Sequence, residues 1–447
     1  MRFSKTQSAL FAALATTVVG TSAQAEGPGL RVGDLAIHPS VFAIGGYDDN
    51  VYFAAPQESP LGASLLRIGG GVALENRSPN KISLEGGADV SYRHLFPSGT
   101  PENSKAVEAR NTLDRAGLNA TVGFLPRAPI TTELHENLTF RDNPAYEELE
   151  IGFRKLDNIA GVDLRFRPGA DADSRPFELR LGYRLETVSY LGDKTSEIGA
   201  DLAEKTAHNL NFLSQWRFLP KTSLLAEVGW SSVHYDRKLE QPAVTAGGTF
   251  ETTSADRDSR PVYAVVGVKG LITRRISTNL KVGYKNTFNV SGSSYNGVIA
   301  TAEGTYAIEP TLRATLGYNR DGRDTSFANT YTLNQVYAVT DVYFLGRWSA
   351  GGRIGFDYYA YASDAGGVKR LDGDRTDPVV RGSIYAGFDP KDWLSIKAKF
   401  ESVDNLSNYE IGRFAAEHPA ATGGTGAQVD RVAYSRQQFG LEVQARY

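Results

Sequence analysis

Apolar and polar residues alternate through residues 81–95. One set of alternate positions is apolar or small: Ile82, Leu84, Gly86, Ala88, Val90 and Tyr92. The other set is polar, charged or glycine: Ser83, Glu85, Gly87, Asp89, Ser91 and Arg93. Side chains of a β-strand point alternately to the two faces of a sheet. The segment therefore predicts a strand with one apolar face and one charged face.

The same alternation recurs along most of the chain, in segments as long as a tilted strand needs to cross a bilayer. It predicts about eighteen strands, at 35–47, 64–76, 81–94, 112–125, 130–141, 157–167, 177–190, 207–218, 223–235, 261–272, 278–288, 296–308, 312–320, 331–344, 348–360, 378–388, 393–403 and 430–447. A soluble sandwich would show this alternation with its polar face toward bulk water. In a membrane barrel the apolar face meets lipid and the polar face lines a wet lumen.

The connections between these segments alternate in length. Short ones lie at 77–80, 126–129, 219–221, 272–276, 309–311, 345–347 and 389–392. Longer ones lie between them, at 48–63, 95–111, 142–156, 191–206, 236–260, 289–295, 321–330, 361–377 and 404–429. The turn at 168–176 is longer than the other short ones. Short periplasmic turns and long outer loops are typical of outer-membrane barrels, so we expect both termini on the periplasmic side.

The N-terminal residues predict a secretory signal peptide. Arg2 and Lys5 precede an apolar run at 9–19, and Ala23-Gln24-Ala25 has the form of a cleavage site. We expect a signal peptide over 1–25 and one β-barrel domain over 26–447. No later apolar run is long enough for a transmembrane helix. An exported chain of this kind is either soluble or a barrel.

The last residues favour the barrel. Alternation continues to a terminal aromatic residue through Phe439, Leu441, Val443, Ala445 and Tyr447. Such a strand resembles the assembly signal of Gram-negative outer-membrane barrels. We therefore predict an all-β fold, a transmembrane antiparallel up-and-down β-barrel of about 18 strands (16–18), in the cell outer membrane.

Composition excludes several kinds of function. The chain has no cysteine, which removes disulfides, thiolate metal sites and cysteine nucleophiles. Without Arg2 and Lys5 it has 46 basic and 51 acidic residues, a net charge of −5 that predicts no nucleic-acid partner. The six histidines are scattered and form no H-E-x-x-H motif. We predict no catalytic residue, no bound metal and no cofactor.

The polar faces of the strands supply the candidate pore wall. We expect these residues to line the pore: Arg93, Arg115, Arg141, Asp163, Arg165, Arg180, Arg184, Arg353, Asp357, Tyr359, Arg381 and Tyr385. The charged ones would either form ion-pair ladders that solvate the wall or set the field that selects a solute. The inward tyrosines would either stack on sugar rings or fill gaps beneath a loop.

The first predicted strand and the loop after it carry a resemblance to a known family. They read Pro39-Ser40-Val41-Phe42-Ala43-Ile44-Gly45-Gly46-Tyr47-Asp48-Asp49-Asn50-Val51-Tyr52. This resembles a family of β-barrel porins that open with a strand closing on YDDNV and an aromatic residue. Members often belong to exopolysaccharide export systems, in which a periplasmic export protein works with the barrel. The resemblance implies no particular binding residue.

These patterns predict an outer-membrane channel in contact with lipid, most simply the exit for a secreted exopolysaccharide. A barrel of this size encloses an aqueous channel. One alternative is a general diffusion porin for small hydrophilic solutes. A barrel hydrolase, with His94 and Asp48 or Asp49 as its only rim candidates, is another, and a structural or adhesive barrel is a third.

Overall fold

The computed structural model describes most of the region after the expected signal peptide. The described residues are 29–51, 53, 60–76, 81–97, 111–142, 154–169, 176–191, 204–236, 238–244, 250–308, 311–325, 328–362, 364–365, 368–369, 375–408, 410–411, 430–431 and 433–447. The expected signal peptide, residues 1–25, lies outside them.

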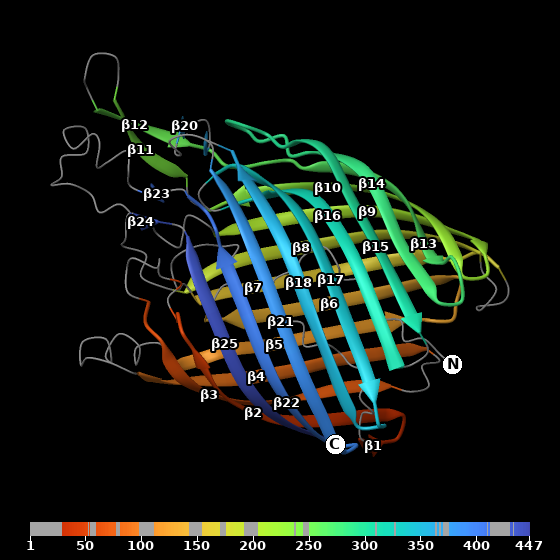
Figure 1. The fold of residues 1–447 in the computed structure, drawn as a ribbon. Helices are drawn as coiled ribbons and strands as arrows, with labels where there is room; N and C mark the ends of the chain where they lie inside the picture. Colours follow the sequence, from red (N-terminus) through yellow and green to blue (C-terminus); the bar gives the residue numbers. More distant parts are fainter. Residues whose placement is uncertain are drawn as a thin grey trace.

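The described residues form a closed antiparallel barrel of eighteen strands (Figure 1). Around the ring the strands are β2 (Leu35–Asp48), β3 (Ala63–Asn76), β4 (Ile82–Pro97), β5 (Thr112–Phe124), β6 (Ile130–Arg141), β7 (Arg154–Phe166), β8 (Phe177–Leu191), β9 (Lys205–Leu219), β10 (Thr222–Tyr235), β13 (Val262–Leu271), β14 (Ile276–Asn286), β15 (Asn296–Ile308), β16 (Leu312–Asp324), β17 (Thr330–Phe344), β18 (Trp348–Tyr361), β21 (Thr376–Lys391), β22 (Leu394–Asn405) and β25 (Tyr434–Arg446). Each strand pairs with its neighbours in chain order, and β25 closes the ring on β2. The predicted fold class is confirmed.

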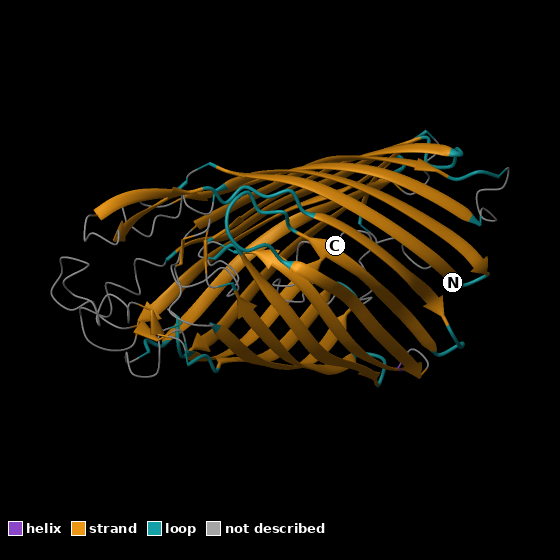
Figure 2. Cartoon of the chain, turned by 90° about the horizontal axis from the view of Figure 1, so that it is seen from above, coloured by secondary structure: helices purple, strands orange, loops and turns teal. Residues whose placement is uncertain are grey.

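Shorter strands lie outside the ring of eighteen. β1 (Leu30–Val32) pairs with the first residues of β2, a stretch that β25 does not reach. The long connections hold three small hairpins: β11 (Leu239–Val244) with β12 (Phe250–Ala255), β19 (Asp364–Ala365) with β20 (Val368–Lys369), and β23 (Glu410–Ile411) with β24 (Asp430–Arg431). Figure 2 shows that strands make up most of the described chain and that the described loops join their ends.

The predicted strands all exist, and the errors lie at their ends. β16 continues to Asp324 through part of a predicted loop, and β4 continues to Pro97. The last strand starts at Tyr434 and not at 430, since Asp430–Arg431 belongs to a hairpin. Alternation weakens where strands rise above the lipid, because both faces then meet water or loops.

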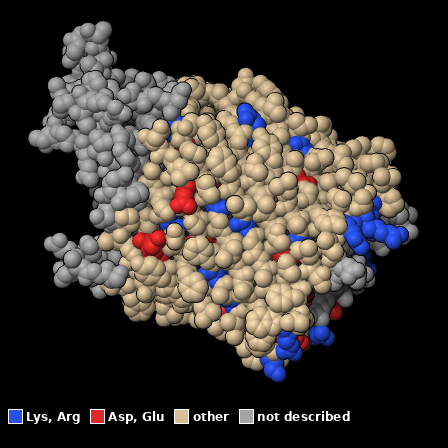
Figure 3. Space-filling model, in the orientation of Figure 1, with Lys and Arg blue, Asp and Glu red and all other residues tan. Residues whose placement is uncertain are grey.

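Three large residues that the sequence predicts to face lipid, Ile82, Val90 and Tyr92, are exposed on the outer wall. Ile82, Val90 and Tyr92 keep 51%, 49% and 43% of their surface, whereas Ser91 and Arg93, between and beside them, keep 5% and 6%. The outer face in Figure 3 is mostly uncharged. An exposed apolar wall around a closed sheet is stable in lipid and not in water. The chain is therefore an outer-membrane type of barrel.

Aromatic residues gather beside the short turns. Trp216, Trp348 and Trp393 are all exposed, which suits rings at a membrane interface. The Trp348 ring centroid lies 4.6 Å from that of Phe388 and 6.4 Å from that of Phe344. The described residues contain no helix that is long and apolar enough to span a membrane.

The seam between β2 and β25 ends in a polar cluster that we call the seam clasp: Asp48, Asp49, Asn50, Ser435, Arg436 and Gln437. Arg436 Nε donates to Oδ1 and Oδ2 of Asp48 at 3.0 and 3.1 Å. The Asp49 and Gln437 backbone N–H groups donate to the Gln437 carbonyl and to Asp49 Oδ1, at 3.1 and 2.6 Å. Asn50 Nδ2 donates to the Ser435 carbonyl at 2.9 Å. Residues 48–50 of the YDDN motif therefore join β2 to β25, the first and last strands of the ring.

Charge on the outer wall should destabilise the barrel far more than charge on the inner wall. Leu134 and Asn137 are exposed near the middle of β6 on opposite faces. We expect Leu134→Arg to lower the free energy of unfolding in lipid vesicles by about 2–4 kcal/mol, the cost of an arginine near the bilayer midplane. Asn137→Arg, on the lumen face, should change it much less. Equal losses would contradict the assigned faces.

Removing the buried carboxylate of the clasp should weaken barrel closure. Asp48 is 3% exposed, so Asp48→Ala leaves Arg436 without its partner. We expect a loss of about 3 kcal/mol in urea unfolding, as for other buried ion pairs cut on one side. The double variant Asp48→Ala, Arg436→Ala should recover part of that loss. The single variant Arg436→Ala completes the comparison. If the double variant loses as much stability as Asp48→Ala and Arg436→Ala lose separately, added together, the pair is not coupled.

Candidate pore wall

Contacts that skip a strand identify the inner face of the barrel. Arg67 on β3 reaches Asp114 on β5 at 2.8 Å, and Lys281 on β14 reaches Glu227 on β10 at 3.4 Å. Neighbouring strands lie about 4.8 Å apart, so second neighbours are almost 10 Å apart at the backbone. Side chains bridge that distance only where they converge, on the concave face. These residues and those of the same parity therefore face the lumen.

Three pairs of arginines lie directly opposite one another on this wall. The register opposes Arg67 to Arg93, Arg115 to Arg141, and Arg165 to Arg180. Like charges in directly opposed positions destabilise a sheet. The wall must therefore supply carboxylates beside them or leave the charge uncompensated.

A β-bulge supplies the carboxylate for the first pair. The β4–β5 register shifts at Ser91/Tyr92, so Asp114 and Arg115 both turn inward although they are consecutive. Asp114 accepts an ion pair from Arg67 at 2.8 Å and from Arg93 at 2.9 Å. Bulges often redirect a side chain in this way. Parity alone could not predict the inward direction of Asp114.

The second bridged pair is Arg165 with Arg180. Glu133 forms an ion pair with Arg165, and Glu178 accepts Arg180 Nη2 at 3.3 Å. Glu178 also lies 3.9 Å from Arg167. Each of these side chains is less than one quarter exposed. The carboxylates therefore compensate most of the charge at this place on the wall.

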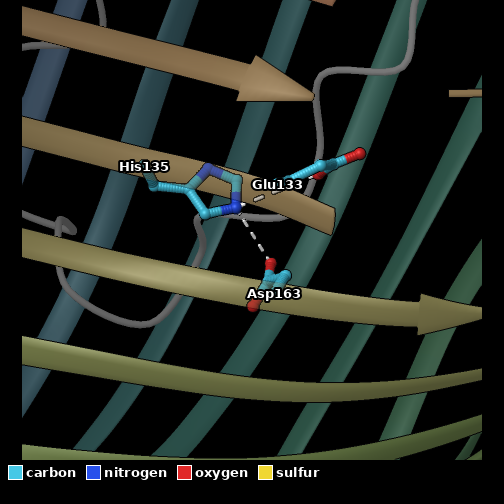
Figure 4. Close-up of side chains that lie close together, drawn as sticks. All are labelled: Glu133, His135 and Asp163. Carbon is cyan, nitrogen blue, oxygen red and sulfur yellow. Dashed lines mark hydrogen bonds and ion pairs between the residues drawn. The ribbon is translucent and has the colours of Figure 1, made fainter. Parts of the chain in front are cut away.

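Glu133, His135 and Asp163 lie close enough together to suggest a metal site (Figure 4). His135 Nε2 is 3.0 Å from Asp163 Oδ2 and 3.9 Å from Glu133 Oε2. However, Arg184 contacts both Asp163 oxygens, at 2.9 and 3.1 Å, and Arg165 holds Glu133. The arginines already neutralise both carboxylates, so a cation would have to displace them. We interpret the cluster as an ion-pair network.

Three inward tyrosines lie flat over glycines of the neighbouring strand. The register opposes Tyr263 to Gly229, Tyr337 to Gly317, and Tyr385 to Gly351. A Cβ atom on any of these glycines would lie within 2.6 Å of the opposing ring. The hydroxyls donate to carboxylates, Tyr337 to Glu303 at 2.6 Å and Tyr385 to Asp341 at 2.8 Å. Each ring covers backbone that a glycine leaves bare.

Four of the candidate residues are buried in the wall, which corrects the expectation that they line the open pore. Tyr359 is 1% exposed in a cluster with Tyr331, Tyr361, Leu333 and Val379, and Arg381 Nη2 donates to its hydroxyl at 3.1 Å. Its ring therefore offers no face for a sugar. The others are Arg93, Asp163 and Asp357, at 6%, 1% and 1% exposed. Their ion-pair partners cover them.

The other candidates are partly exposed on the inner parity: Arg115, Arg141, Arg165, Arg180, Arg184, Arg353, Arg381 and Tyr385. The Arg353 guanidinium lies 4.9 Å from the Tyr337 ring centroid, and Lys397 Nζ lies 5.8 Å from that of Tyr385. The two rim candidates for a hydrolase are separate. Asp48 belongs to the seam clasp, and His94 packs edge-on against Phe96.

Comparison with known proteins gives limited similarity. No family model matches the chain. It is 28% identical over 156 residues to outer membrane protein SlpA of Deinococcus radiodurans, which is 32% of this chain but only 13% of that protein. Among solved structures it is similar to outer membrane protein opdK of Pseudomonas aeruginosa, with 10% identity and a TM-score of 0.45 over 92% of this chain and 99% of the other. It is also similar to the siderophore receptor PirA of Acinetobacter baumannii, with 9% identity and a TM-score of 0.47 over 92% of this chain and 80% of the other. The assignment of the fold rests on this chain's own strand pairing.

The tyrosine–glycine pairs should be sensitive to one added methyl group. In Gly317→Ala the new Cβ would lie 2.2 Å from Tyr337 Cζ. We expect a loss of about 1–3 kcal/mol in the free energy of unfolding, as for other overpacked sites. Gly304→Ala on the adjacent strand is the control, because its Cβ meets open space. A Gly317→Ala barrel as stable as the control would mean that the ring is free to move aside.

Proposed function

We propose that this chain forms a water-filled outer-membrane channel through which a secreted exopolysaccharide leaves the cell. The observation that carries the proposal is the inner wall of the closed barrel, where many charged side chains accompany three tyrosine rings that lie flat over glycines. Eighteen strands are enough to enclose an aqueous channel. Charged and hydroxyl groups on such a wall suit a hydrated solute rather than an apolar one.

The tyrosines favour a sugar polymer over a small nutrient. Tyr337 and Tyr385 each combine a flat ring, which packs against a glycine, with a cation over the ring that a sugar would have to displace in order to stack. A sugar stacks through its C–H face and hydrogen-bonds through its rim, so a polymer would meet the same pair of contacts repeatedly. Several weak contacts along a wall hold a chain in the channel without trapping any one unit.

A periplasmic export protein is the partner that this proposal requires. The described turns on the periplasmic side are short, for example 220–221, 345–347 and 392–393. Such turns offer little surface of their own for gathering a polymer. A separate periplasmic protein would therefore deliver it to the channel.

Deleting the gene separates export from general diffusion. We expect the surface polysaccharide to disappear or to accumulate in the periplasm, while the uptake of small sugars stays almost unchanged. A diffusion porin would give the opposite result, with polysaccharide intact and uptake reduced. Normal surface polysaccharide in the deletion strain would refute the export proposal.

Ring substitutions test the proposed contact. Tyr385→Ala removes a stacking surface that contributes about 1 kcal/mol, so secretion should fall while the barrel still assembles. Tyr385→Phe keeps the ring and loses only the hydroxyl that Asp341 accepts. It should therefore secrete as the wild type does. Equal secretion by a well-assembled Tyr385→Ala variant would remove this ring from the mechanism.

A further inference from the structure

The three opposed arginine pairs are not equally compensated. Asp114 bridges the first pair, and Glu133 and Glu178 serve the two members of the pair nearest the periplasm. In the remaining pair, Arg115 contacts Asp89 at 3.1 Å. The side chain of its opposite member, Arg141, makes no hydrogen bond or ion pair with any residue of the described chain.

Arg141 has a cation on each side. The register opposes it to Arg115 on β5 and to Lys155 on β7. Side chains in such positions have Cβ atoms about 4.5–5.5 Å apart. Lys155 has its own carboxylate, Asp157, at 3.2 Å. We call Arg115, Arg141 and Lys155 the cation row. Its two flanking members each form an ion pair, and its centre forms none among the residues that the structure describes.

The row lies on the inner face at the outer end of the barrel. Arg141 shares the inward parity of Glu133 and His135 and is the last residue of β6, next to a long connection. It is partly exposed, so a solute in the lumen can reach it. An uncompensated guanidinium between two like charges lowers its energy by binding an anion, and its planar fork suits an oxyanion held by two hydrogen bonds.

We infer that the cation row is a binding subsite for an oxyanion group, a carboxylate, sulfate or phosphate, on the solute that leaves through the channel. The inference rests on the proposed function and narrows it to an acidic polymer. Arg141 supplies the two-pronged contact, and Arg115 and Lys155 supply the surrounding positive potential. The metal-like cluster of Glu133, His135 and Asp163 differs, since its arginines are already occupied.

Planar bilayers containing the purified full chain test the subsite with defined probes. The probes are a tetramer of glucuronic acid and the neutral tetramer of glucose, each added at fixed ionic strength because salt screens the interaction. The measured quantity is the concentration that blocks half of the current. We expect Arg141→Gln to raise the half-blocking concentration of the acidic tetramer about tenfold, equivalent to 1.4 kcal/mol. The half-blocking concentration of the neutral tetramer should stay unchanged.

Arg154→Gln is the matched control. It removes one positive charge from the same rim, but Arg154 is already paired with Asp142 at 3.1 Å. It should shift the block by the acidic tetramer less than twofold. Arg141→Lys keeps the charge without the planar fork and should give an intermediate shift. Arg141→Gln should also unfold no more easily than the wild type, since it relieves like-charge repulsion.

The outcomes distinguish this inference from the proposed function. A wild-type protein that assembles but conducts no current would remove the channel itself. A conducting channel in which Arg141→Gln leaves acidic block unchanged, or weakens neutral block equally, would overturn the subsite and leave the channel standing. If Arg154→Gln weakens block by the acidic tetramer as much as Arg141→Gln does, the subsite is also overturned, because the general charge of the rim would then explain the effect.

Discussion

Closure of the sheet is the constraint on which the rest of this structure depends. In hydrocarbon each backbone N–H and C=O must find a partner within the protein, and an open strand edge leaves a whole row of them unpaired. Pairing of β2 with β25, from Ser40 opposite Arg446 to Asp48 opposite Gln438, removes the last edge. The ring of eighteen strands then fixes the width of the lumen and the direction of every side chain on the wall.

The strands were predictable because their two faces meet different solvents. Lipid on one side and water on the other impose a strict period of two, which single residues such as Val90 and Arg93 display clearly. Where both faces of a strand meet similar surroundings, the sequence predicts the extent of the strand less well. The small hairpins in the long connections and the extension of β16 to Asp324 carry no comparable alternation.

Alternation along a strand predicts the face of the sheet on which a candidate residue lies, but not the residues that its side chain contacts. Parity placed Tyr359 inward correctly, yet a packed cluster buries it, and no local pattern encodes that cluster. Strict alternation along β5 would turn Asp114 outward, but a bulge breaks the period by one residue and turns it inward. The tyrosine–glycine pairs were in principle visible, since each glycine sits on the inward parity of the strand beside its tyrosine. Finding them needs the strand register as well as the sequence.

Curvature explains why charge on the inner wall is organised in groups. Side chains on a concave surface converge, so each charged residue meets partners two strands away as well as its neighbours. A like-charged pair thus gains access to carboxylates that a flat sheet would keep out of reach. Burying these ion pairs in the wall thickens it and narrows the water-filled space. The charged residues therefore determine the thickness of the wall as well as the electric field in the lumen.

The seam clasp also bears on the order of assembly. Asp48 and Arg436 are separated by 388 residues, so their contact forms only when nearly all the strands are in place. Contacts between distant parts of a chain are slow to form, because the entropy of closing the loop must be met first. A chain interrupted anywhere between them keeps both edges open and lacks the clasp. The contact thus distinguishes a finished ring from every shorter intermediate.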